Sequence, residues 1–159
     1  MKIWMWGAAL MICALMAVMA CGTMTAAEQA ERIQAVSKAL ESKHYTVSIQ
    51  MMYPSRGGAK SVTSDYSLEV KGDTLVSYLP YIGRAYNVPY GGGKGLNFTA
   101  PIKHYEATKD NKGRTRVVIL TDNEEDLITY YLEVWDTAQT TIDVQSRERE
   151  PINYSGEVK

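Results

Sequence analysis

The hydrophobic pattern of this chain changes its period once, and that change restricts the fold more than any other feature. After the first 25 residues, apolar residues recur at helical spacing. Thr25 and Glu28, three residues apart at the start of this series, have the spacing of a helix capping box. We therefore predict one amphipathic helix over residues 26–42. Beyond it, apolar and polar residues alternate with a period of two. This order of elements excludes a dinucleotide-binding fold, in which strands and helices alternate.

Short turns join the expected strands into hairpins. Gly72-Asp73 has the form of a hairpin turn, and Gly113 can supply the positive φ that a short loop needs. About seven or eight sequential strands make an antiparallel meander, which curls into a barrel or a strongly curved sheet with the helix packed on it or closing an end. The predicted class is α+β, mostly antiparallel β. The expected strands are residues 45–54, 66–71, 74–79, 103–109, 114–121, 128–134 and 140–147.

Two charged segments interrupt this pattern. Residues 122–126 are predicted to form an acidic, exposed loop between two hairpins. Near residue 147 the charges begin to alternate and Pro151 follows, so residues 149–159 are predicted to be a loosely ordered tail. Residues 26–148 then form a single helix-plus-meander domain. The net charge of −1 gives no reason to expect a nucleic-acid partner.

The start of the chain carries an apolar run that predicts an export signal over residues 1–20. No basic cluster follows the run, and Val18-Met19-Ala20-Cys21 resembles a bacterial lipobox. Cys21 is therefore predicted to become an acylated N-terminus with palmitate-type chains, followed by a short tether over residues 21–25. The alternatives are an ordinary secretory signal, cut near Ala20 or Ala26, and an uncleaved anchor helix.

The residues after the cysteine predict which way the protein faces. Acidic residues directly after the lipidated cysteine are typical of Bacteroidetes lipoproteins that are sent to the cell surface, and here the first acidic residue is Glu28. We therefore expect a lipoprotein of the outer membrane that faces the periplasm. The membrane, reached through the lipid, is its expected partner.

Residues 77–98 break the strand pattern with tyrosine, proline and glycine. The glycines do not form a phosphate-binding P-loop, because Gly93-Lys94 is followed by Gly95 where serine or threonine is required. Two interpretations stay open: a wide turn whose tyrosines cover a barrel end, or a rigid binding lip for a small molecule, a glycan or a protein. The candidate binding residues of this lip are Tyr78, Tyr81, Arg84, Tyr86, Tyr90, Lys94 and Phe98.

The same segment carries a resemblance to a known family. A tyrosine-rich strand, then Gly83-Arg84-Ala85-Tyr86, then Pro89-Tyr90-Gly91-Gly92-Gly93-Lys94-Gly95-Leu96-Asn97-Phe98 resemble the Bacteroidetes lipoprotein family known as domain of unknown function 4251. The resemblance extends from the lipobox through the helix to the last hairpin. It implies an exported, lipid-anchored single domain and supplies no catalytic residues.

Residues that could support catalysis or metal binding are sparse. The chain has two histidines, His44 and His104, and neither HxxxH nor CxxC spacing, so a zinc site would need both histidines and a carboxylate. His104 and Glu106 are the candidate acid–base pair. We predict no catalytic residue, no metal and no cofactor, and hence a non-catalytic binding or interaction module. The alternatives are an envelope-assembly accessory and, more weakly, a hydrolase.

Two threonines are candidate modification sites. Asp73-Thr74-Leu75 and Asp136-Thr137-Ala138 resemble the Asp-Thr-aliphatic sites at which Bacteroidetes attach O-linked glycans. Both fall at predicted hairpin turns, where an enzyme can reach Thr74 and Thr137. Asp-Thr is also ordinary turn chemistry, so both interpretations stay open.

Overall fold

One helix opens the part of the chain that the computed structural model describes, which is residues 25–62, 65–87 and 90–159. Cys21 and the predicted export signal lie outside these residues. The helix, α2, spans Ala26–Glu41 and confirms the prediction. Thr25 Oγ1 accepts a hydrogen bond from Glu28 N, and the Glu28 carboxylate accepts one from Thr25 N, so the capping box is present. The hydrogen bonds that the Thr25 backbone N–H and hydroxyl donate to the Glu28 carboxylate lower the pKa of that carboxyl.

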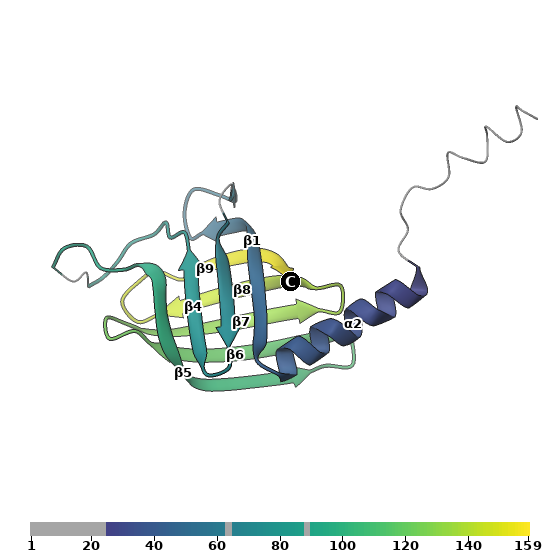
Figure 1. The fold of residues 1–159 in the computed structure, drawn as a ribbon. Coiled ribbons are helices and arrows are strands. Elements are labelled where there is room, and N and C mark those ends of the chain that lie inside the picture. The colour runs from purple at the N-terminus through teal and green to yellow at the C-terminus, as the bar shows by residue number, and fades with distance from the viewer. Residues whose placement is uncertain (1–24, 63–64, 88–89) are drawn as a thin grey trace, which may run out of the picture.

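The described residues after the helix form a nine-stranded antiparallel sheet in the order β2-β1-β3-β4-β5-β6-β7-β8-β9 (Figure 1). The predicted meander is confirmed, because from β3 to β9 each strand pairs with the next one in the chain. The strands are β1 His44–Pro54, β2 Lys60–Ser61, β3 Ser67–Lys71, β4 Thr74–Leu79, β5 Leu96–Lys109, β6 Arg114–Asp122, β7 Leu127–Trp135, β8 Gln139–Ser146 and β9 Ile152–Val158.

The sheet closes on itself because β1 pairs with β9 as well as with β3. This pairing runs from Val47 opposite Val158 to Pro54 opposite Ile152. The result is an eight-stranded barrel with β2 as one extra strand on β1. The barrel-like sheet predicted from the sequence is therefore present in its fully closed form.

The closing strand corrects one prediction. Residues 149–159 are not a loosely ordered tail, because Ile152–Val158 forms β9 between β8 and β1. Ile152, Tyr154 and Val158 point inward and are buried, with polar residues between them on the outside. The charges before Pro151 obscure this short period-two pattern in the sequence.

A second difference concerns the start of β5. The predicted strand begins at residue 103, whereas β5 begins at Leu96 and pairs with β4 through Pro101. Leu96, Phe98 and Ala100 are buried, which places the end of the tyrosine- and glycine-rich segment inside the barrel wall. Pro101, which has no N–H to donate, lies next to the register shift of β5 between Ile102 and His104, where a ladder interruption is tolerated.

Side chains fill the barrel interior. Two tyrosines lie among the aliphatic residues, and burial raises the pKa of both hydroxyls. Tyr130 donates a hydrogen bond to Ser77 Oγ at 3.1 Å, and Ser77 Oγ donates one to Leu96 O at 2.7 Å, so this buried polar chain is satisfied. The largest fully buried side chains are Leu68, Leu75, Leu79, Leu96, Ile119, Ile128, Tyr130, Leu132, Ile142, Ile152 and Tyr154.

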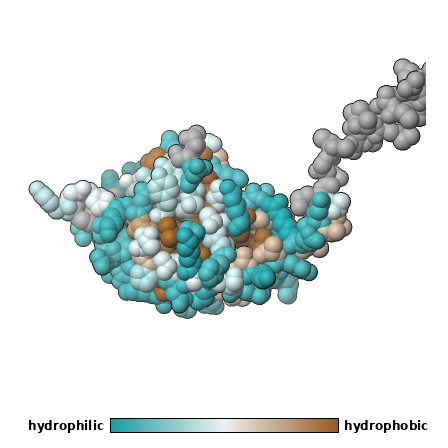
Figure 2. Space-filling view, in the orientation of Figure 1, coloured by the Kyte–Doolittle hydropathy of each residue, from teal (hydrophilic) through white to brown (hydrophobic). Residues whose placement is uncertain are grey.

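The barrel has two unlike ends. At one end, α2 packs through Val36 and Leu40, and Tyr105 of β5 donates a hydrogen bond to Leu40 O at 3.0 Å. At the other end lie the long β4–β5 loop, the β6–β7 turn and the β8–β9 connection (Figure 1). Hydrophilic residues cover most of the face in view, with only small hydrophobic patches (Figure 2). No helix within the described ranges is long and apolar enough to cross a membrane.

Candidate functional site

The β4–β5 loop, residues 80–95, projects from the barrel end opposite α2 (Figure 1). Its start is held by the barrel core, because the buried Tyr154 of β9 donates a hydrogen bond to Pro80 O at 2.7 Å. Gly91 and Gly92 have φ values of 99° and 101°, which L side chains adopt only with strain. These glycines allow a wide turn, which is one of the two interpretations of this segment of the sequence.

The first half of the loop docks on the β8–β9 connection like a short extra strand. Ala85 and Arg149 form an antiparallel bridge, and Tyr86 N donates a hydrogen bond to Glu148 O at 2.7 Å. Glu150 N donates to Arg84 O at 2.9 Å, and Arg84 N donates to the Glu150 carboxylate at 3.1 Å. The backbone of this half is therefore fixed, and the side chain of Glu150 serves as a clamp.

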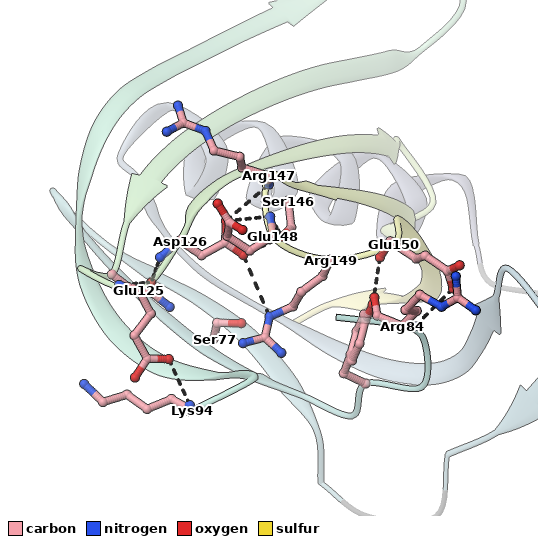
Figure 3. Close-up of polar contacts among 12 residues, drawn as sticks. Ser77, Arg84, Lys94, Glu125, Asp126, Ser146, Arg147, Glu148, Arg149 and Glu150 are labelled. Carbon is pink, nitrogen blue, oxygen red and sulfur yellow. Dashed lines mark hydrogen bonds and ion pairs between the residues drawn. The ribbon is translucent and has the colours of Figure 1, made fainter. Parts of the chain in front are cut away.

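The second half is held by the β6–β7 turn. Lys94 N donates a hydrogen bond to the Glu125 carboxylate at 3.0 Å (Figure 3). Asn97 N, at the start of β5, donates to Lys94 O at 3.1 Å. Both bases of the loop are therefore clamped, and residues 90–94 between them are exposed.

A buried ion pair lies beneath the loop, between the β6–β7 turn and the β8–β9 connection. Arg149 Nε lies 3.8 Å from Asp126 Oδ2, and the two side chains are 7% and 1% exposed (Figure 3). Asp126 Oδ1 accepts hydrogen bonds from the backbone N–H groups of Arg147 and Glu148, and Oδ2 accepts one from the Ser146 hydroxyl. The carboxylate is thus fully hydrogen-bonded and joins both segments.

Tyr81 covers this pair. Its ring lies 5.7 Å from the Arg149 guanidinium carbon, within the range of a cation–π contact. The Tyr81 hydroxyl lies 3.0 Å from Glu150 O, to which it donates. Burial raises the pKa of this hydroxyl, and the Arg149 charge partly opposes the rise. Tyr81 is therefore a structural part of the barrel end.

Sequence reasoning missed this cluster. Residues 122–126 were expected to form an exposed acidic loop, but Asn123 and Asp126 are buried. Asn123 Oδ1 accepts hydrogen bonds from Glu125 N and Asp126 N, which folds the turn back so that Asp126 points into the barrel end. The Asn-x-x-Asp spacing was the one local signal that this turn is built inward.

Comparison with known proteins identifies the family. A family model described as a domain of unknown function, DUF4251, matches residues 27–158. The chain belongs to the DUF4251 family. Among solved structures, it is similar to the crystal structure of a DUF4251 family protein from Bacteroides eggerthii DSM 20697, with a TM-score of 0.62 and 15% identity over 82% of this chain and 90% of that one. Comparison with curated proteins found no match.

The DUF4251 barrel separates the predicted lip residues. Tyr86, Tyr90 and Lys94 are exposed on the loop, and Tyr81 and Arg84 form its docked base. Two of the predicted residues lie elsewhere: Tyr78 is on the outer wall, where its ring lies 5.0 Å from that of Tyr66, and Phe98 is buried in the core. On the loop, the exposed lip residues are therefore Arg84, which is docked through its backbone, together with Tyr86, Tyr90 and Lys94.

The remaining candidate residues of this DUF4251 domain lie on its surface. His104 Nε2 and Glu106 Oε2 are 3.6 Å apart, with side chains 56% and 64% exposed. Thr74 begins β4 and is half-buried, and Thr137 is exposed in the β7–β8 turn. Within residues 25–62, 65–87 and 90–159, no three His, Cys, Asp or Glu side chains gather in an arrangement that could hold a metal ion.

Proposed function

We propose that this protein is a lipid-anchored protein of the cell envelope, a non-catalytic interaction module that presents the β4–β5 loop to a protein partner. The observation that carries the proposal is the loop itself, which is clamped at both bases by Glu150 and Glu125 while Tyr86 and Tyr90 are exposed. Exposed tyrosines on a preorganised loop lose little entropy on binding, which favours an interface.

The interior and the surface both favour a partner that binds outside the barrel. Large buried side chains fill the interior, so it does not offer the open, polar cavity that a small enclosed ligand needs. The exposed His104–Glu106 pair lacks the shelter from water that strengthens acid–base chemistry. These observations support an interaction module over a hydrolase.

Anchoring through Cys21 would orient the barrel. Cys21 lies four residues before Thr25, the cap of α2, and α2 lies at the barrel end opposite the loop (Figure 1). Arg32 of α2 pairs with Glu157 of β9, which ties the helix to the barrel. A lipid at this end supports a loop that faces away from the membrane, where a periplasmic partner can reach it.

The anchor is tested by replacing Cys21 with serine in the full-length chain expressed in bacterial cells. We expect the variant to lose essentially all metabolic labelling with palmitate and to leave the membrane fraction, because the acceptor thiol is gone. Cys13→Ser, which removes the other cysteine, is the control and should keep both the label and the membrane location. Palmitate labelling that persists in Cys21→Ser would disprove the anchor.

The loop is tested with a photo-crosslinking amino acid in place of Tyr90. We expect a discrete crosslinked envelope complex in living cells, and we expect Tyr86→Ser to lower its yield about tenfold, since exposed aromatic residues dominate interface energies. The same crosslinker in place of Tyr78, an exposed tyrosine of the outer wall, should not trap that complex. Equal trapping at both positions, or no effect of Tyr86→Ser, would contradict an interface at the loop.

A further inference from the structure

A row of four outward-facing residues crosses the barrel wall on strands β7, β8, β9 and β1. Tyr131 of β7 pairs with Asp143 of β8, Asp143 pairs with Asn153 of β9, and Asn153 pairs with Tyr53 of β1. Buried core residues flank Tyr131, Asp143 and Asn153 on both sides, and the buried Met52 precedes Tyr53, so all four side chains lie on the outer face. The row therefore has a tyrosine at each end and two polar side chains between them.

The row lies in an open groove of about 600 Å³, within the size range of ligand sites. Its two tyrosines are three strand spacings apart, roughly 14 Å. Thr141 and Ser155 continue the polar floor, and a second groove that shares these two residues extends it towards Trp135 of β7. The wall thus carries a trough that combines polar side chains with the rings of Tyr53, Tyr131 and Trp135.

One polar atom in the floor of the groove has no hydrogen-bond partner in the part of the chain that the structure describes. Among the described residues, none donates a hydrogen bond to the buried Asp143 Oδ1, which is costly for a carboxylate oxygen. Glu133, the other acid of the groove, is instead paired with Arg114 at 3.2 Å and with Arg116 at 3.4 Å. The uncompensated charge of the groove is therefore the single negative charge of Asp143.

We propose that this groove binds a short, neutral oligosaccharide. The C–H faces of sugar rings pack on tyrosine and tryptophan rings, and sugar hydroxyls can donate hydrogen bonds to the carboxylate of Asp143, which lines the groove. The distance between the two tyrosines suits two or three linked sugar rings. An anionic glycan is disfavoured, because Asp143 repels it and the nearby arginines are already paired with Glu133. This site is separate from the loop of the proposed function.

Calorimetric titration of the purified full-length protein with maltotriose, cellotriose and chitotriose tests the proposal. We expect at least one of these neutral trisaccharides to bind with a dissociation constant below about 10 mM, and trigalacturonate to bind at least about tenfold more weakly. Tyr131→Ala and Asp143→Asn should each raise the dissociation constant about tenfold. Asp143→Asn keeps the size of the side chain, so its effect does not depend on whether the tyrosine variant folds.

Two matched controls separate this groove from other surfaces. Tyr78→Ala removes an equally exposed tyrosine from another part of the wall, and Tyr86→Ala removes one from the loop. Neither should change trisaccharide binding. The proposed glycan site would be overturned if none of the three neutral trisaccharides binds, or if trigalacturonate binds equally well. It would also be overturned if binding survives Tyr131→Ala and Asp143→Asn. Loss of binding in Tyr86→Ala would also overturn it and move the glycan site to the loop.

Discussion

Replacing Gly156 with alanine is expected to lower the free energy of unfolding by about 3 kcal/mol, because it forces apart the strands that close the barrel. Gly156 of β9 lies opposite Ile49 of β1, where β1 carries a bulge between Ile49 and Met51. A Cβ at this position would overlap the Ser48 carbonyl oxygen and lie 2.9 Å from the carbonyl carbon. Backbone atoms in a hydrogen-bonded seam cannot move aside as a flexible side chain does.

The measurement is urea unfolding followed by circular dichroism, with Ser155→Ala as the control. Ser155 is the neighbouring residue on β9, but its side chain lies on the outer face, where it contacts the Tyr53 hydroxyl at 3.2 Å. We expect Ser155→Ala to change the free energy of unfolding by less than about 1 kcal/mol. A Gly156→Ala protein as stable as Ser155→Ala would show that β1 and β9 do not approach each other this closely.

The parts of the fold that could be predicted from the sequence are those that local interactions determine. The capping box of Thr25 and Glu28 defines the start of α2 within one helical turn. Gly72 has a φ of 61° in the turn between β3 and β4, a conformation that the sequence signals through glycine. Period-two alternation then identifies the inward face of each strand, because side chains of a strand point alternately to its two sides.

The closure of the barrel could not be predicted in this way. It depends on β1 pairing with β9 across almost the whole domain, and no local pattern specifies which distant strand edges meet. Ile152, Tyr154 and Val158 do alternate, but Gly156 interrupts the apolar series at a point where the β1 backbone leaves no room for a Cβ. The residue that permits closure is thus also one that weakens the sequence signal for β9.

The same limit applies to the candidate site. Tyr86 and Tyr90 are exposed, as a binding lip requires. The sequence signals this exposure because a glycine-rich segment interrupts the alternating pattern of the strands. The Asp126–Arg149 pair was missed because its partners lie in separate charged segments, each of which on its own is typical of a solvated loop. The groove with Tyr131 and Tyr53 was missed because its row depends on the strand order around the closed barrel.

Replacing Asp126 with asparagine is expected to destabilise the barrel by about 3–5 kcal/mol, since it leaves the Arg149 charge buried without its partner. Asparagine keeps the size of the side chain and one acceptor for the backbone N–H groups of Arg147 and Glu148. The decrease in the free energy of unfolding therefore reports chiefly on the lost charge. The measurement is again urea unfolding. Asp73→Asn is the control, because Asp73 pairs with Lys43 on the surface and is 87% exposed; it should cost less than about 1 kcal/mol.

A double variant distinguishes an uncompensated charge from a damaged turn. Asp126→Asn combined with Arg149→Met removes both charges and leaves an unbranched side chain to pack under the Tyr81 ring. We expect the double variant to recover at least half of the stability lost in Asp126→Asn, because replacing both members of a buried pair costs less than removing one. If the losses of the two single variants simply add, the carboxylate stabilises the barrel end through its hydrogen bonds to Ser146, Arg147 and Glu148 instead, and the buried charge of Arg149 is tolerated on its own.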